Sequence, residues 1–205
     1  RPLTNETAAE LVAKVMEMAP PWVRIMRVQR DIPAFKIRAG PTAGNLRELA
    51  LEIIRLHNKT SKEIRFREVG FRKIDPSLMN TFRVRVLKYR ASNGVEYFIS
   101  YENDAGDIAG YLRLRKPSEL AHRKEARDSA IVRELRVVGR VVAVGESGEG
   151  WQHRGIGSML MHEAEKVSKE EIGAKKVIVI SGIGVRNYYR KLGYQREGPY
   201  MSKAI

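Results

Sequence analysis

The sequence predicts an α/β fold in which a mixed sheet is flanked by helices and preceded by a basic helix–strand segment. Three observations predict this fold. Residues 81–115 alternate apolar and charged side chains across two tight-turn signals, as in an antiparallel meander. Residues 129–144 are rich in β-branched side chains and lead into a glycine turn and then an amphipathic helical pattern. Residues 175–181 form a continuous apolar run, which is typical of a buried strand.

The N-terminal part predicts two helices and two short strands. Residues 4–18 repeat apolar side chains at helical spacing and end at a Pro-Pro pair. A second helix is expected after Asn45, with Glu48 three residues later as in a capping box. Residues 22–29 and 63–69 alternate apolar side chains with arginines, so each is expected to form a strand.

The C-terminal part supplies the remaining elements. The helix after Gly155 is expected to end at Gly173, because glycine readily adopts the left-handed conformation that ends helices. A short helix follows in residues 185–192, and one last strand is expected at about 194–202. The stretch Gly70–Pro76 suggests a boundary between a basic segment, residues 1–75, and a second domain, residues 76–205.

Composition limits the classes of protein that fit. The 205 residues contain no cysteine, so disulfides, Cys-ligated zinc, iron–sulfur clusters and a Cys nucleophile are excluded within this chain. The net charge of +14 favours a polyanionic partner such as nucleic acid, although a solvated basic surface would give the same excess. No apolar run of membrane-spanning length and no signal-peptide core are present, which predicts a cytoplasmic protein without a membrane partner. The missing initiator Met suggests a piece of a longer chain.

The segment WQHRGIGSML, residues 151–160, contains a candidate anion site. Gly155 and Gly157 allow close approach to the backbone, and the first N–H groups of the following helix have no partner within that helix. A phosphate or pyrophosphate is a natural ligand there. The alternative is a helix start whose glycines serve only close packing.

Basic side chains are concentrated in the N-terminal segment. They form a candidate track for a phosphate backbone, with the exposed basic edge of a strand as the alternative. The candidate nucleic-acid-binding residues are Arg24, Arg27, Arg30, Lys36, Arg38, Arg65 and Arg67.

Two motifs together resemble the GNAT-type N-acetyltransferases. Gln152-x-x-Gly155-x-Gly157 resembles that family's acetyl-CoA pyrophosphate loop, and residues 188–194 (YYRKLGY) resemble its closing helix-turn-strand segment. The resemblance implies a GNAT fold, acetyl-CoA as cofactor and a strand edge that pairs with the pantetheine arm. The residues it implies for acetyl-CoA binding are Leu135, Val137, Val138, Gln152, His153, Arg154, Gly155, Ile156, Gly157, Ser158 and Tyr189.

Three side chains are candidates for catalysis. A Tyr hydroxyl can supply the proton that the departing CoA thiolate needs, and Tyr189 matches the family's tyrosine best, with Tyr188 second. Both could instead be core aromatics. Glu134 lies among apolar strand residues that could raise its pKa and make it a general base; a solvent-facing residue paired with an arginine is the alternative. The four histidines show no metal-ligand spacing, so no metal site is predicted.

The resemblance extends to the family of Elongator catalytic subunits. The segments that carry it are residues 20–34, 45–52, 67–70, 114–119, 133–139, 151–161 and 181–203. That family joins a radical-SAM domain to an acetyltransferase domain and is implicated in acetyl-CoA-dependent, carboxymethyl-type modification of the wobble uridine of tRNA at C5. The resemblance therefore implies tRNA as partner, SAM and a 4Fe–4S cluster in the full enzyme, and other Elongator-like subunits or self-association.

Two departures from that family bear on these expectations. The cluster-binding cysteines are absent, so the chain resembles only the C-terminal half: the end of the radical-SAM domain or its linker, then the acetyltransferase domain. Family members often carry a Cys pair where this chain has Ser61-Lys62-Glu63, so metal binding there is not expected. Two other functions fit the acetyltransferase motifs: a protein lysine N-acetyltransferase, and a non-catalytic module that binds tRNA or CoA.

Overall fold

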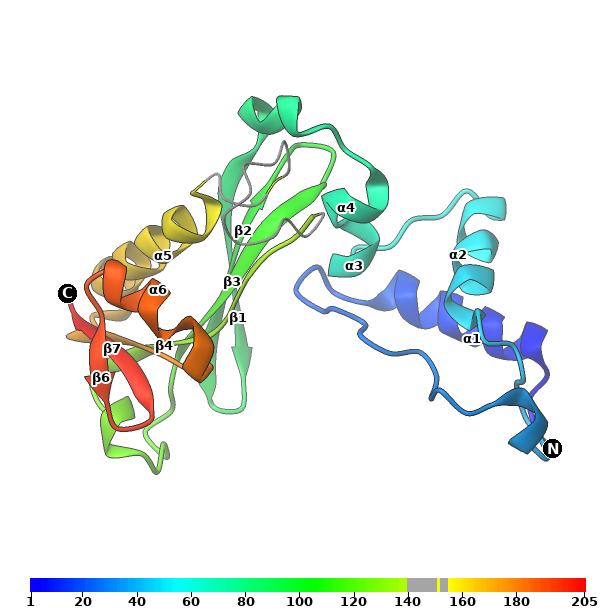
Figure 1. Cartoon of the computed structure of the whole chain (residues 1–205), viewed down its shortest axis with the longest axis horizontal. Helices are drawn as coiled ribbons and strands as arrows, with labels where there is room; N and C mark the ends of the chain where they lie inside the picture. Colours follow the sequence, from blue (N-terminus) through cyan, green and yellow to red (C-terminus); the bar gives the residue numbers. More distant parts are fainter. Residues whose placement is uncertain (140–150, 152–154) are drawn as a thin grey trace. The chain divides into compact units, whose positions relative to one another are not determined.

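The structure is a computed structural model that describes residues 1–139, 151 and 155–205 (Figure 1). The described chain divides into two compact units, Arg1–Arg72 and Lys73–Ile205. None of the described helices combines the length and the apolar character that crossing a membrane requires.

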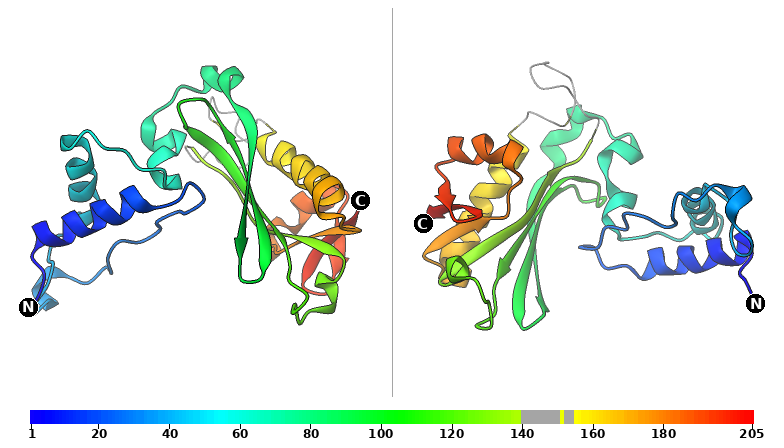
Figure 2. Two further views of the ribbon diagram at one scale, coloured as in Figure 1. Left: turned by 180° about the vertical axis from the view of Figure 1, so that it is seen from behind. Right: turned by 60° about the horizontal axis from the view of Figure 1, so that its bottom comes forward.

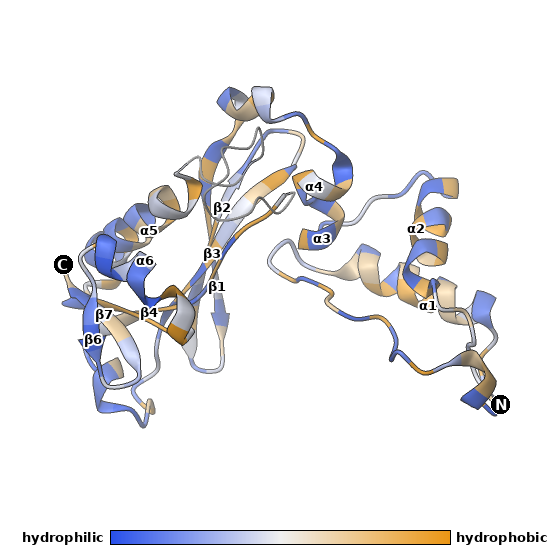
Figure 3. Cartoon of the chain, viewed as in Figure 1, coloured by the Kyte–Doolittle hydropathy of each residue, from blue (hydrophilic) through white to orange (hydrophobic). Residues whose placement is uncertain are grey.

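The first unit is built on two helices, α1 (Asn5–Met18) and α2 (Leu46–Leu56), which confirms both helix predictions. Thr4 caps α1, because its side chain accepts a hydrogen bond from the N–H of Thr7. The helices pack through a small apolar core that contains Met16 and Ile54, both fully buried. Figure 3 shows α2 banded in blue and orange, as expected of a helix with one apolar side.

The capping box predicted at Asn45 is not formed. Asn45 does precede the first helical residue of α2, but its side chain makes no capping hydrogen bond. Its backbone, at φ −113° and ψ 33°, lies outside the extended region from which such a side chain reaches the helix N–H groups. The start of α2 therefore depends on packing: Leu46 is buried against Ala8 and Ala9 of α1.

The two strands predicted in the first unit are wrong. Residues 63–69 contain instead the short helix α3 (Ile64–Arg67), followed by α4 (Val69–Arg72). Residues 22–29 are not a strand, and the next regular element is a 3-10 turn at Ala34–Lys36.

A buried carboxylate explains how the extended segment around Ile25 is held without a sheet. Glu63 is fully buried and accepts hydrogen bonds from the N–H groups of Ile25 (3.3 Å) and Arg65 (2.9 Å). It also forms an ion pair with Arg47, whose guanidinium in turn donates to the carbonyl of Ile25 at 3.2 Å. These bonds satisfy polar backbone groups that a neighbouring strand would otherwise satisfy.

The second unit contains one seven-stranded mixed sheet in the order β1-β2-β3-β4-β5-β7-β6. The meander is confirmed: β1 (Arg83–Ala91), β2 (Gly94–Glu102) and β3 (Ile108–Lys116) run antiparallel and are followed by β4 (Ser129–Val137). Two 3-10 turns, Pro76–Thr81 and Lys124–Ala126, precede β1 and β4.

Parallel pairing occurs once among the described strands, between β4 and β5 (Lys176–Val179). The chain closes with a hairpin, β6 (Gln195–Glu197) and β7 (Tyr200–Ala204), in place of the single last strand that was expected. Gly198, with φ +58°, lies at its turn and explains why the pattern breaks there. β4 ends at Val137, earlier than predicted, and residues 140–144 lie outside the described residues.

Helices cover one face of this sheet around β3 and β4 (Figure 2). α5 (Ile156–Val167) continues as a π-helical turn, Ser168–Ile172, and ends as predicted at Gly173, which has φ +69°. The contact with β3 is close, because a Cβ added at Gly110 would lie 2.9 Å from the Ile156 side chain. A 3-10 turn, Ile183–Val185, leads into the short helix α6 (Arg186–Lys191).

Candidate acetyl-CoA site

The sheet opens between β4 and β5. Pairing of the two strands runs only from Ser129–Lys176 to Val132–Val179, and the N–H of Ile180 then donates to the carbonyl of Val132 at 3.0 Å. Beyond that point, residues 133–137 of β4 have no β5 partner in the described part of the chain. β4 is therefore paired with β3 on one side and offers an edge on the other, and an amide-containing ligand could pair with that edge.

The predicted strand-edge residues occupy this open stretch only in part. Leu135 and Val137 are half-buried and pair with Leu112 and Gly110 of β3. Val138 follows the end of the strand, and its N–H already donates to the carbonyl of Ala109 at 2.9 Å. The backbone N–H of Val138 is thus not available to a ligand.

The glycine turn leads directly into α5. Gly155 has φ +77° and ψ 0°, a left-handed conformation that favours glycine, and its carbonyl accepts the hydrogen bond from Met159 that starts the helix. The first N–H groups of α5 have no partner within the helix and lie at the positive end of its dipole. Ser158 is exposed there, while the Ile156 side chain is buried, so Ile156 could contact a ligand only through its backbone.

Residues of β4, α5 and α6 lie close together at Gly157. A Cβ added at Gly157 would lie 2.7 Å from the hydroxyl of Tyr188 on α6 and 3.8 Å from a methyl group of Val137 on β4. The end of β4, the first turn of α5 and the side chain of Tyr188 therefore converge at one point. The absence of a side chain at Gly157 lets the Tyr188 hydroxyl approach the first turn of α5 this closely.

The two adjacent tyrosines have different environments. The Tyr188 hydroxyl is buried without a well-formed hydrogen bond to any described residue. Burial raises the pKa of Tyr188, and a weak interaction with the Ser158 side chain offsets part of the rise. Tyr189 is enclosed, with its ring packed edge-on against Tyr188 and Tyr194 at centroid distances of 5.2 and 6.1 Å. Burial, followed by the charge effect of Tyr188, raises the pKa of Tyr189 to about 12.

Two residues that the sequence analysis did not single out follow β5: Ser181 lies between β5 and α6, and Arg186 is the first residue of α6. The Oγ of Ser181 and the Nε of Arg186 are buried and have no hydrogen-bond partner among the described residues. Buried polar atoms in folded proteins normally have partners, so unpaired ones next to a candidate site point to a ligand. Their signal in the sequence is that both lie within seven residues before Tyr188.

Glu134 does not have the environment predicted for a general base. Its carboxylate accepts hydrogen bonds from Tyr111 and Arg113, each at 2.8 Å, and lies 3.4 Å from Arg136. Burial alone would raise the pKa of Glu134, but the hydrogen bonds from Arg113 and Tyr111 and the two arginine charges outweigh it and lower that pKa. The expectation of a raised pKa is therefore wrong, because Tyr111 and Arg113 of the neighbouring strand β3 supply hydrogen bonds to this carboxylate.

A Glu134→Gln variant is expected to retain its acetyl-CoA hydrolysis rate within about threefold between pH 7 and 9, whereas loss of a general base costs roughly 100- to 10,000-fold. The carboxylate is held by Tyr111 and Arg113, and its lowered pKa makes it a weak proton acceptor, so little of the rate is expected to depend on it. The rate can be followed with a thiol reagent, since the chain has no cysteine to react. A hundredfold loss at pH 7 would assign Glu134 a catalytic role.

Some predicted residues lie outside the site or cannot be placed. Gln152, His153 and Arg154 fall outside the described residues. Trp151 is described: it is buried, contacts Phe82 and donates to the carbonyl of Ile74 at 3.2 Å. No group of three or more His, Cys, Asp or Glu side chains that could hold a metal ion occurs in the described ranges.

The predicted nucleic-acid-binding residues divide into buried and exposed ones. Arg24 forms an ion pair with Glu68 at 2.6 Å, with both side chains largely buried. Arg67 is also buried and donates to the carbonyls of Lys62 and Pro21, each at 2.8 Å. These two guanidinium groups hold the first unit together. The side chains that reach solvent are Arg27, Arg30, Lys36 and Arg38.

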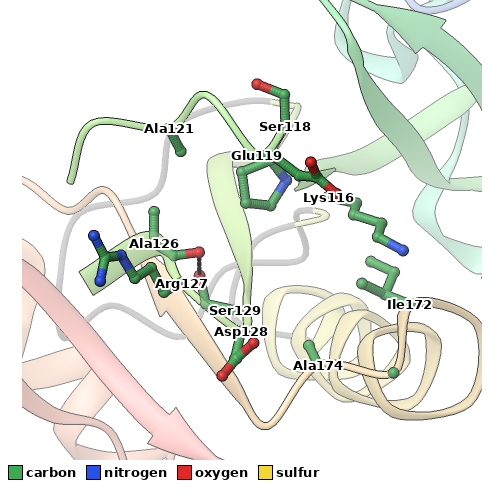
Figure 4. Close-up of a pocket in the computed structure, with 12 residues that line it drawn as sticks. Lys116, Ser118, Glu119, Ala121, Ala126, Arg127, Asp128, Ser129, Ile172 and Ala174 are labelled. Carbon is green, nitrogen blue, oxygen red and sulfur yellow. Dashed lines mark hydrogen bonds between the residues drawn. The ribbon is translucent and has the colours of Figure 1, made fainter. Parts of the chain in front are cut away.

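A pocket of about 580 Å³ lies at the opposite end of β4 (Figure 4). It is lined by residues of the β3–β4 connection, by Ser129 at the start of β4 and by the end of the π-helical turn at Ile172. The Ser129 hydroxyl donates to the carbonyl of Ala126 at 2.9 Å within it. Because Ser129 is the first residue of β4 and Val137 the last, this pocket is separate from the candidate site at Gly157.

Comparison with protein families gives two matches. Residues 1–56 match the Radical_SAM C-terminal domain, and residues 65–194 match the Acetyltransferase (GNAT) family. The second match covers most of the sheet together with α5 and the two tyrosines of α6.

The chain is also similar to named proteins over nearly its whole length. It is 47% identical to Elongator complex protein 3 of Drosophila melanogaster over 201 residues, which is 96% of this chain and 36% of that relative. The human protein of the same name is 46% identical over 201 residues, 96% of this chain and 37% of that relative. An N-terminally deleted form of the archaeal Methanocaldococcus infernus Elp3 superposes with a TM-score of 0.89 at 41% identity, over all of this chain and 50% of that one. The chain thus spans between a third and a half of the length of these relatives.

Proposed function

Because the chain belongs to the GNAT acetyltransferase family and corresponds to the C-terminal portion of Elongator complex protein 3, we propose that it binds acetyl-CoA for a tRNA-modifying enzyme. The modification would be carboxymethyl-type, at C5 of the wobble uridine. The observation that carries the acetyl-CoA site is the convergence of Val137, Gly157 and the Tyr188 hydroxyl at the first turn of α5.

The residues present fit acetyl-CoA. The first N–H groups of α5, with Gly155 and Gly157, suit the pyrophosphate, because backbone donors at a helix start bind anions without side chains in the way. The open edge of residues 133–137 suits the amides of the pantetheine arm. The unpaired polar atoms of Ser181, Arg186 and Tyr188 could be satisfied by a bound ligand.

Acetyl-CoA would supply an activated acetyl thioester. As the C–S bond breaks, the acetyl carbon would bond to an acceptor, which is water in the hydrolysis reaction. The electron pair would stay on sulfur, and the thiolate would take a proton. Tyr189, whose pKa is raised to about 12, is fully protonated at neutral pH and is the proposed donor. Tyr188, whose hydroxyl lies against the first turn of α5, would position the bound cofactor.

Radical-SAM chemistry would require residues outside this chain. The chain contains no cysteine, so a 4Fe–4S cluster would be held by another part of the protein. The likeness of residues 1–56 to the Radical_SAM C-terminal domain supports the proposal that such a part acts with this chain and activates the acetyl group with a SAM-derived radical.

The tRNA contact is proposed for the exposed part of the first unit. Arg30, Lys36 and Arg38 reach solvent from one irregular segment and have no carboxylate partner among the described residues, whereas Arg27 lies 3.3 Å from Asp31. Phe35 in the same segment is 86% exposed, and an exposed aromatic ring among cations is typical of surfaces that bind unpaired bases.

Replacing Arg30, Lys36 and Arg38 together with glutamine is expected to weaken tRNA binding and to reduce the slope of log affinity against log salt by about 2 to 3, since each lost phosphate contact removes about 0.7 to 0.9. The matched control replaces three exposed lysines elsewhere, Lys14, Lys166 and Lys169, and so removes the same charge.

Equal slopes in the two triple variants would contradict the tRNA track. Failure of the unaltered chain to bind tRNA at low salt would contradict tRNA as partner and would favour a protein lysine acetyltransferase. The lowered pKa of Glu134 counts against that alternative, because such an enzyme needs a base to deprotonate the lysine.

A further inference from the structure

The first unit contains a pocket of about 500 Å³ whose walls are rich in arginine. It lies between α2 and the two short helices α3 and α4. We call it the arginine pocket, and its lining residues are Arg47, Glu48, Leu51, Arg55, Arg65, Phe66, Phe71 and Arg72. None of the exposed residues proposed above for the tRNA contact lines it.

The arginines of this pocket differ in what they can offer a ligand. Arg47 is committed to the buried carboxylate of Glu63. Arg65 donates to the carbonyl of Met26 at 3.3 Å, and its Nε is buried without a partner in the described part of the chain. Arg55 is exposed and makes no ion pair with any described residue. Arg55 and Arg65 thus outnumber the one carboxylate of the lining, Glu48, and this excess of positive charge favours an anionic group.

The pocket also presents an aromatic ring. Phe71 is 59% exposed, and the Arg65 guanidinium lies over its ring at 4.9 Å from the centroid. Leu51 and Phe66 form an apolar floor, since both pack against the core of α1 and α2. Arg65 covers part of the ring; the part that stays exposed beside an apolar floor costs free energy in water and suits a planar ligand that stacks on it.

We propose that the arginine pocket binds one unpaired nucleotide of RNA, with the phosphate at Arg55 and Arg65 and the base stacked on Phe71. The inference rests on the tRNA partner proposed above and adds a second contact to it. A nucleotide combines the planar ring and the anion that this pocket accommodates, and base stacking of this kind tolerates any base. Glu48 at the rim can accept a hydrogen bond from a base amino group.

Two substitutions separate the two halves of the contact. Phe71→Leu keeps an apolar side chain but removes the ring, so tRNA affinity is expected to fall about tenfold. Arg55→Gln is expected to weaken binding and to lower the salt slope by roughly 0.7 to 0.9, as for one lost phosphate contact. Lys14→Gln on α1 is the charge-matched control, because Lys14 is exposed in the same unit. Both test positions are exposed, so the variants are expected to fold.

A direct readout comes from Phe71→Trp in the 205-residue chain. The chain already contains Trp22 and Trp151, so the signal is the difference from the unaltered chain. Stacking of a base on the new indole should quench this difference when tRNA or a short oligouridylate is added, and Arg55→Gln in the same background should shift that titration to higher RNA concentration. Two results would contradict nucleotide binding at the arginine pocket: unchanged fluorescence at saturating tRNA, or affinities of Phe71→Leu and Arg55→Gln equal to that of Lys14→Gln. Neither result would contradict tRNA as the partner. Absence of any tRNA binding by the unaltered chain would refute both.

Discussion

A Gly157→Val variant is expected to bind acetyl-CoA about 100-fold more weakly than the unaltered chain, a loss of about 2.8 kcal/mol. A Cβ at this position would lie 2.7 Å from the Tyr188 hydroxyl, so the valine and the tyrosine cannot both keep their places. The two added methyl groups would also cover the first turn of α5, where the pyrophosphate is proposed to bind. Isothermal titration calorimetry measures the affinity directly.

The matched control is Gly44→Val. A Cβ at Gly44 meets nothing within 4 Å, and Gly44 does not have a positive φ, so this variant adds the same side chain without a clash. It should bind acetyl-CoA as the unaltered chain does. Circular dichroism establishes whether both variants fold. A folded Gly157→Val protein with unchanged affinity would contradict the proposed site.

A Tyr189→Phe variant is expected to lose roughly 100- to 10,000-fold in the rate of acetyl-CoA cleavage, the usual contribution of a positioned general acid, with its acetyl-CoA affinity nearly unchanged. The ring remains, so the packing against Tyr188 and Tyr194 is kept and only the proton donor is removed.

The pH dependence gives a second test of Tyr189. A donor must be protonated to act, and the folded-state pKa of Tyr189 is raised to about 12, above the ordinary 10 of a tyrosine. Once the uncatalysed hydrolysis is subtracted, the rate should therefore stay level from pH 8 to 10 and fall only as the pH approaches 12. Tyr194→Phe is the control: the Tyr194 hydroxyl donates to Glu165 at 2.9 Å, so its loss should reduce stability more than rate. A full rate in Tyr189→Phe would remove Tyr189 from the mechanism.

The elements that sequence alone predicts correctly are those whose burial follows one local period. The meander is an example, because β1 to β3 alternate side chains between two faces and are joined by short turns. α5 is another, with Leu160 and Ala164 fully buried at helical spacing and Gly173 at its end. In both cases the spacing of apolar residues within the element is enough to predict its secondary structure.

The errors occur where a distant polar group decides the local structure. Residues 63–69 alternate like a strand, yet they are helical because Glu63 caps α3 and is itself fixed by Arg47 on α2. The environment of Glu134 was mistaken for the same reason: Tyr111 and Arg113 come from the neighbouring strand β3. No window of sequence around either glutamate contains these partners.

The candidate site also combines features that local sequence predicts with features that depend on distant residues. The glycine turn and the two tyrosines are visible as motifs, since each needs a particular residue type at a fixed spacing. The juxtaposition of Gly157 with Tyr188 depends on how β4, α5 and α6 pack, and a sequence pattern does not contain it. The arginine pocket likewise joins Arg55 of α2 with Phe71 of α4, elements that are separate in sequence.

Amide hydrogen exchange with and without acetyl-CoA tests the central claim most directly, because the claim specifies which backbone groups the ligand covers. Bound acetyl-CoA should slow exchange at the open edge of β4, residues 133–137, and in the first turn of α5 at Gly157 and Ser158. The pocket at the start of β4, around Ser129, should show no change. Protection confined to that pocket, or no protection at β4 and α5 at saturating acetyl-CoA, would contradict the account.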